Sequence, residues 1–340
     1  MWKWIQRQAS PKVFYGTCSR LTPWFFWPFA SLLVIGLFWS LVISPPDYQQ
    51  GDGYRIIFIH VPSAILSMMV YAIMAIAGGI GLIWQIKMAE VVAKVSAPIG
   101  AAFTIIALTS GAIWGKPMWG AWWVWDARLT SELILLFLYL AYISLNSAFD
   151  NPRTAAKASS ILAIVGLINL PIIHYSVKWW NTLHQGYSVG TGGLKDPDMQ
   201  IALAIMFVAS IFLYVLLVSI KARTEVLVRE QNSRWVKEKI QELDITSIQS
   251  KSLILLKIFV GIVIVVFIIV FTGYIVELQK NSDLTLIKYL DFLPYGKYAL
   301  YVWLSYMLCM LTIIFLFIGA DINHKNTFSY LKTKYAINND

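Results

Sequence analysis

Charged residues are scarce in this sequence. Only 13% of its 340 residues are Asp, Glu, Lys or Arg, whereas 58% are hydrophobic. A soluble domain carries about 25% charged residues, so this chain cannot cover a globular surface with polar side chains. The shortage of charge excludes an ordinary soluble protein and indicates a membrane protein. We attribute the net charge of +9 to cytoplasmic loops rather than to nucleic-acid binding.

Cysteine is equally scarce, and its two occurrences are Cys18 and Cys309. They form no CxxC pair, no zinc ligand set and no disulfide framework. The sequence also lacks the GxSxG, Walker and HExxH motifs, so we expect neither hydrolysis nor direct use of ATP, and no enzyme. No cleavable signal peptide is expected either, because the first apolar run is long enough to remain as a span.

Long apolar runs are what the sequence has instead. Eight of them approach or exceed the roughly 20 residues that cross a bilayer core as a helix, and none shows the alternation of a membrane β-barrel. We therefore predict an all-α, polytopic transmembrane helical bundle of about eight helices. The predicted spans are 24–44, 57–86, 95–114, 131–149, 159–175, 198–220, 252–277 and 298–319.

Lysine and arginine are unevenly distributed between the two sides of this bundle. With the N-terminus inside, the inner segments hold more than twice as many of these residues as the outer segments, as the positive-inside rule requires. Both termini are therefore predicted to be cytoplasmic. This orientation places the loop after the third span and the connection 174–198 on the outer side.

A change of composition divides the chain near residue 221. The segment 221–251 is charged and predicts a cytoplasmic helical linker between six spans and two further spans. We expect a six-span module over 1–220, a connector span over 252–277, and a last segment over 278–340 with one span and a basic tail.

The outer loop after the third span reads WGAWWVWDARLT. Tryptophan is common at membrane interfaces, and an interfacial belt accounts for one or two such residues. Four within seven positions favour a surface for a flat apolar ligand. If the stretch were helical, three of them would share a face with Asp126. The four are Trp119, Trp122, Trp123 and Trp125.

Three charged residues follow these tryptophans. Arg128 is suited to pair with carboxylates of a ligand, because a guanidinium binds a carboxylate through two parallel hydrogen bonds. A surface pair with Asp126 that contributes little is the alternative. We expect Asp126 to accept hydrogen bonds from the backbone, from Arg128 or from a neighbouring loop, and Glu132 to be a carboxylate at a helix start.

Three of the four histidines fall on the predicted outer side. His60 lies in IIFIHVPSA, where Pro62 places it at or just before a helix N-terminus. His184 lies in the polar loop NTLHQG, whereas His174 lies in the apolar run LPIIHYS and is expected to be a hydrogen-bonded core residue. A single interfacial histidine is more often a hydrogen-bonded helix end than a ligand. Two histidines that face each other across an aromatic surface favour axial coordination of haem iron.

These segments resemble the WWD-signature family of haem-handling membrane proteins in cytochrome c maturation, of the CcmC type. The resemblance covers about residues 20–220 and is carried by HVPSA, WGKPMWGAWWVWDARLTSELILLF and NLPIIHYSVKWWNTLHQGYS, in this order. It implies six spans in the bacterial inner membrane, with b-type haem held at the periplasmic face by His60 and His184. It also implies a haem platform made of Trp119, Gly120, Trp122, Trp123, Trp125 and Asp126.

The same resemblance implies partners. Proteins of this type present haem to the periplasmic chaperone CcmE and work beside the ABC-type pair CcmA and CcmB. Arg128 would pair with the haem propionates. The absence of CxxCH means that this chain is not expected to bond haem covalently.

The last quarter of the chain departs from that family. Residues 294–316, PYGKYALYVWLSYMLCMLTIIFL, resemble the small single-span partner CcmD, which predicts a fusion of two partners. The run 252–277 would then be the extra crossing that lets the CcmD-like helix begin outside and end in the cytoplasm. An unrelated two-span tail is the alternative.

Two other functions compete with haem delivery to a chaperone. A haem-translocating permease would need a charged route for propionates, but polar residues within the spans are few, such as Thr104, Thr109 and Ser110. A haem-containing quinol oxidoreductase subunit would need histidine pairs at two membrane depths, whereas the three outer histidines lie near one face.

Overall fold

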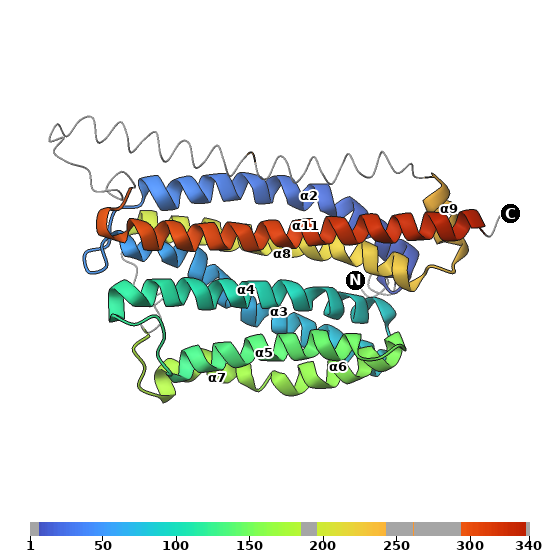
Figure 1. The fold of residues 1–340 in the computed structure, drawn as a ribbon, viewed down its shortest axis with the longest axis horizontal. Coiled ribbons are helices and arrows are strands. Elements are labelled where there is room, and N and C mark those ends of the chain that lie inside the picture. The colour runs from blue at the N-terminus through green and yellow to red at the C-terminus, as the bar shows by residue number, and fades with distance from the viewer. Residues whose placement is uncertain (1–6, 185–195, 243–260, 262–293, 338–340) are drawn as a thin grey trace.

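The computed structural model describes residues 7–184, 196–242, 261 and 294–337. Over these residues the protein is a bundle of long helices, and this part of the chain contains no β-strand (Figure 1). Seven helical segments in it are long and apolar enough to cross a membrane. This confirms the predicted all-α polytopic bundle. The predicted span 252–277 lies outside the described residues except for Gly261.

The described helices and turns lie between Pro11 and Ile337. In chain order they are α2 (Pro11–Phe38), which continues as the π-helical turn η1 (Trp39–Ile43), the 3-10 turn η2 (Asp52–Ile56), α3 (Ile57–Trp84), α4 (Lys87–Trp119), α5 (Ala127–Ser147), α6 (Pro152–Gly166), α7 (Asn169–Trp179), α8 (Pro197–Arg229), α9 (Arg234–Glu242), the 3-10 turn η3 (Gly296–Tyr298) and α11 (Ala299–Ile337).

Helix α4 is the most buried of the described spans and packs against α3, α5, α8 and α11. Small residues permit this close packing, as is usual between membrane helices. A Cβ at Gly100 of α4 would overlap the phenol of Tyr139 from α5. The Tyr139 hydroxyl in turn donates to the carbonyl oxygen of Ser67 in α3 at 2.7 Å. Helices α3, α4 and α5 are thereby fixed relative to one another.

Several predicted spans differ from the observed helices, since α2 begins at Pro11 rather than at residue 24 and α11 continues to Ile337 rather than to residue 319. The fifth, 159–175, consists of two helices, α6 and α7, which meet at a break before Asn169. The amide of Asn169 donates to the carbonyl oxygen of Ser131 at 2.9 Å. The sixth span continues as α8 to Arg229, beyond the expected change at residue 221, because Arg229 pairs with Glu90 of α4 at 2.9 Å. The charged residues after position 221 are therefore helical, and they form ion pairs with neighbouring helices.

Different helix ends and loops lie at the two ends of the bundle. Helix α2 begins and α11 ends at the same end as α9, on the right of Figure 1. The opposite end carries η3 and the segments 44–56, 120–126 and 180–184. We call it the site end, because it brings together both loops that the sequence singles out.

Candidate functional site

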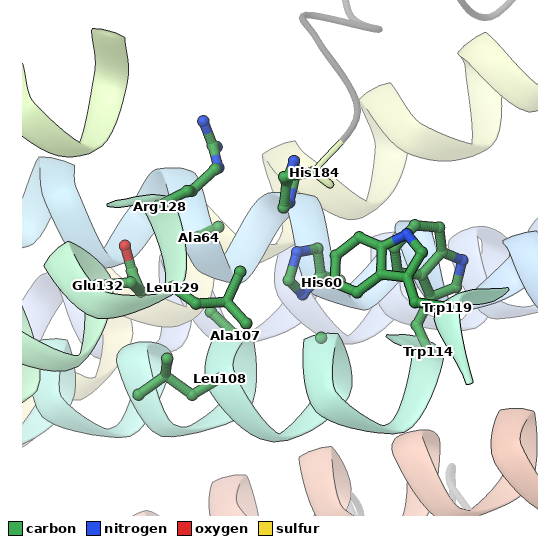
Figure 2. Close-up of a pocket in the computed structure, with 11 residues that line it drawn as sticks. His60, Ala64, Ala107, Leu108, Trp114, Trp119, Arg128, Leu129, Glu132 and His184 are labelled. Carbon is green, nitrogen blue, oxygen red and sulfur yellow. The ribbon is translucent and has the colours of Figure 1, made fainter. Parts of the chain in front are cut away.

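A pocket that is open on one side lies toward the site end, among α3, α4 and α5. Figure 2 shows two histidines between a pair of indoles on one side and a guanidinium with a carboxylate on the other. The lining residues are His60, Ala64, Ala107, Leu108, Gly111, Trp114, Trp119, Arg128, Leu129, Glu132 and His184.

The two histidines come from distant parts of the chain. His60 is the fourth residue of α3, and His184 lies in the loop after α7. Their ring centroids are 6.3 Å apart and their planes differ by 31°. A metal ion held at about 2 Å from one nitrogen of each imidazole would place the ring centres about 6 Å apart. The spacing therefore fits two axial ligands of one iron atom, and their ligand role stays a prediction.

Helix α4 fixes the ring of His60. The Nδ1 atom lies 3.1 Å from Oγ of Ser110, and that hydroxyl donates its own proton to the carbonyl oxygen of Ile106. Since a serine hydroxyl has one proton, its oxygen accepts the Nδ1–H of His60. Nε2 then keeps the lone pair that a metal requires. A Cβ at Gly111 would lie 3.0 Å from Cε1 of His60, so Gly111 leaves space for the ring.

The aromatic loop is not a helix, so the shared helical face considered for it is not formed. Helix α4 ends at Trp119 because Gly120 adopts φ +78°, a conformation that favours glycine. Of the four tryptophans, Trp119 lines the pocket, with its ring 4.9 Å from that of Trp114 and 6.3 Å from that of His184. Trp114 also lines the pocket, although no motif in the sequence singled it out.

The other three tryptophans lie outside the pocket lining. Trp122 is 50% exposed and lies 6.3 Å from Tyr301 of α11. Trp125 is 77% exposed and packs edge-on against Trp123. The indole N–H of Trp123 is buried and has no hydrogen-bond partner among the described residues. Trp122 and Trp125 therefore present apolar surface beside the pocket.

Asp126 caps the N-terminus of α5, where its Oδ1 accepts the backbone N–H of Leu129 at 2.8 Å. A backbone hydrogen bond is among the partners expected for it. Since the helix begins at Ala127, Glu132 is not at its start, and that interpretation is wrong. Glu132 is buried, accepts from Ser67 Oγ at 2.7 Å and lines the pocket. Its spacing of four from Arg128 is the sequence signal for this shared face.

His174 does not belong to the core, and the prediction that it is a buried residue is wrong. It is exposed on α7, and its ring lies edge-on to that of Tyr175 at 4.7 Å. The buried face of this short helix consists of Asn169, Ile173 and Ser176, and His174 points away from it. The apolar run around His174 therefore contributes to both faces of α7, with Ile173 and Ser176 on the buried face and His174 on the outward face.

Comparison with known proteins bears on what this pocket holds. The family model described as "CcmC: Heme exporter protein C" matches residues 4–237. The protein named heme exporter protein C of Haemophilus influenzae is 48% identical over 247 residues, which is 72% of this chain and 100% of the relative. The protein of that name from Escherichia coli K12 is 50% identical over 240 residues, 71% of this chain and 98% of the relative. The chain belongs to the heme exporter protein C family.

Membership of the heme exporter protein C family confirms the CcmC-type resemblance and supports a role in haem delivery for cytochrome c maturation. It agrees with the multi-pass membrane architecture of the described helices. The family match ends at residue 237, so α11 lies beyond it. The resemblance of residues 294–316 to CcmD stays a prediction.

Proposed function

We propose that this protein holds haem at the site end, on the periplasmic face of the bacterial inner membrane, and presents it to the periplasmic chaperone CcmE. His60 and His184 are the axial ligands of the iron. The observation that carries the proposal is their ring spacing of 6.3 Å in the pocket of a heme exporter protein C family member. Haem is the cargo in this proposal, bound as b-type haem without a covalent bond to this chain.

The remaining pocket residues suit the rest of the haem molecule. Trp119 and Trp114 give an apolar wall for the porphyrin. Arg128, on the other side of the histidines (Figure 2), pairs with a propionate. Asp126 acts indirectly, because it caps the helix that carries Arg128 and Glu132. The platform is completed by Gly120, which ends α4, and by Trp122, Trp123 and Trp125 at the rim.

The two histidines have different roles in holding and releasing haem. His60 is fixed by a helix and by Ser110, whereas His184 lies on a loop. We assign His60 to retention, and we assign to His184 the coordination that is lost when the chaperone takes the haem. The fourth histidine, His324, is buried and hydrogen-bonded to Thr224 at 2.9 Å. Its Nδ1 thus contacts a threonine hydroxyl, whereas an electron-transfer subunit would use a second pair of imidazoles.

The proposal includes the membrane arrangement and the partners. CcmA and CcmB are the ABC-type partners, and both termini are cytoplasmic. The six-span module (1–220), the linker (221–251), the connector (252–277) and the CcmD-like segment (278–340) form one natural fusion. The positions of α9 and η3 at opposite ends of the bundle (Figure 1) support an odd number of crossings between them.

An optical spectrum of the detergent-purified protein tests the haem site. The wild-type protein with haem should show a low-spin spectrum of two histidine ligands. His60→Ala and His184→Ala should each lose most of the haem or change this spectrum. His174→Ala is the matched control, because His174 is exposed on α7, and it should leave the spectrum unchanged. Native low-spin spectra in both single ligand variants would contradict the assignment.

A further inference from the structure

The turn that leads into the His60 helix is held by the other end of the chain. The 3-10 turn η2 runs directly into α3, and His60 follows its last residue, Ile56, by four positions. Helix α3 has no side-chain hydrogen bond at its N-cap. The position of its first turn, and so of His60, therefore depends on how η2 is anchored.

Arg55 is the anchor within η2. Its side chain is buried, with the residue 5% exposed. Nε donates to the carboxylate of Asp52 at 2.8 Å, and Nη1 donates to the carbonyl oxygen of Ser40 at 2.7 Å. Ser40 lies in η1, at the end of the first span, where the last carbonyls of a helix have no partners within the helix. Burying a guanidinium without acceptors would cost free energy of folding. The two acceptors offset this cost, and the bond to Ser40 ties η2 to the end of the first span.

Two tyrosines from the C-terminal part of the chain complete this anchor. The hydroxyl of Tyr306, in α11, donates to the carbonyl oxygen of Arg55 at 3.0 Å. The hydroxyl of Tyr295 donates to the carbonyl oxygen of Leu41, in η1, at 2.6 Å. The ring of Tyr295 also lies 4.8 Å from the guanidinium carbon of Arg55, within the range of a cation–π interaction. Both sides of the anchor, η1 and η2, are thus bonded to the same C-terminal segment.

The same segment covers the glycines beside the anchor. A Cβ at Gly53 would lie 3.1 Å from the ring of Tyr298, and one at Gly51 would lie 2.8 Å from it. The ring of Tyr301, one turn further on, lies 6.3 Å from that of Trp122 in the aromatic loop. The C-terminal segment therefore contacts both the turn before His60 and the loop after Trp119.

We propose that the segment 295–306, which contains η3 and the site end of α11, is a positioning element for the haem site, in which Tyr295 and Tyr306 hold the Arg55 turn and thereby set His60 relative to His184. The inference rests on the proposed function, because it takes His60 as an iron ligand. It goes beyond that function, because none of the residues that line the pocket comes from α11. This helix also lies outside the family match, which ends at residue 237.

The test uses the full chain, purified in detergent and loaded with haem, with Tyr295→Phe and Tyr306→Phe combined. Each change removes one hydroxyl and keeps the ring, so the apolar packing is retained. Tyr330→Phe is the matched control, because Tyr330 is exposed in the distal part of α11. The measurements are the haem dissociation rate and the low-spin ferric spectrum. A third measurement is the concentration of added imidazole at which half of the bound haem has exchanged a protein histidine for imidazole.

The double variant should release haem about fivefold faster and need about fivefold less imidazole, with a shifted low-spin signature, since one lost bond is buried and the other is partly buried. The control should match the wild type. Unchanged values in the double variant, with a normal wild-type spectrum, would overturn this inference alone. A wild-type protein without a two-histidine spectrum would overturn the proposed function as well. If the double variant does not fold, Tyr306→Phe alone is measured with the same expected direction, and wild-type values in it would overturn the inference.

Discussion

Ser110 and His60 form the contact that decides which imidazole nitrogen is available to a metal. The serine oxygen lies 3.1 Å from Nδ1, and its proton is engaged by the backbone of its own helix. Neighbours of this kind, which orient a ligand without touching the metal, commonly affect metal affinity about 10- to 100-fold. Ser110, which lies within the third predicted span near its outer end, thus becomes part of the site.

Ser110→Ala should weaken haem binding about tenfold, because Nδ1–H loses its acceptor and the ring loses its orientation. The measurement is a haem titration, together with the midpoint potential of the bound iron. Thr109→Ala is the matched control, since the hydroxyl of Thr109 bonds the carbonyl of Ile105 in the same helix and lies outside the pocket lining. Equal affinities and potentials in the two variants would argue against a role for Ser110.

Gly111→Ala should alter the haem spectrum without harming the helix. Alanine is favoured over glycine in helices by about 1 kcal/mol, but its Cβ would lie 3.0 Å from Cε1 of His60 and force the ring to move. Gly79→Ala is a suitable comparison, because its Cβ would meet Ile164 at an ordinary 3.7 Å. We expect loss of the low-spin signal only in the Gly111 variant. A normal spectrum in it would show that the ring has room to spare.

The aromatic loop should contact haem rather than serve only as a membrane anchor. Trp119→Ala should weaken haem retention about tenfold or more, because this ring lies in the pocket beside His184. Trp123→Ala and Trp125→Ala should have smaller effects, since these rings lie outside the pocket lining. Haem content and chaperone loading are measured in protein that still inserts into the membrane. Wild-type values in all three variants would mean that these tryptophans serve only as anchors at the membrane interface.

Much of this site could be predicted from the sequence, because its signals are local. The apolar runs and the distribution of lysine and arginine placed His60, His184 and the tryptophan loop on one side of the membrane. The chemistry of imidazole then predicts an iron site, and this ligand role stays a prediction. These predictions need only the type of each residue and its side of the membrane. Detailed side-chain packing does not enter them.

The predictions that failed depended on where a helix begins and which way it faces. Glu132 faces the pocket because Asp126 caps α5 one turn earlier than the apolar run suggested. His174 faces outward because the fifth span breaks before Asn169 and its second half has its own buried face. The contact of Tyr306 with Arg55 joins residues 251 positions apart, and no local pattern reveals such a pair.

The CcmD-like segment should enter the membrane from the periplasmic side. Lys297 and Thr333 are exposed near the two ends of α11, so a cysteine at each reports the side of its end. The native Cys18 and Cys309 are buried and are replaced by serine to remove background. In intact cells a membrane-impermeant thiol reagent should label cysteine at position 297 and leave position 333 unlabelled until the cells are permeabilised. The reverse pattern would mean that the chain crosses an even number of times between α8 and α11, and the topological reason for a connector at 252–277 would be lost.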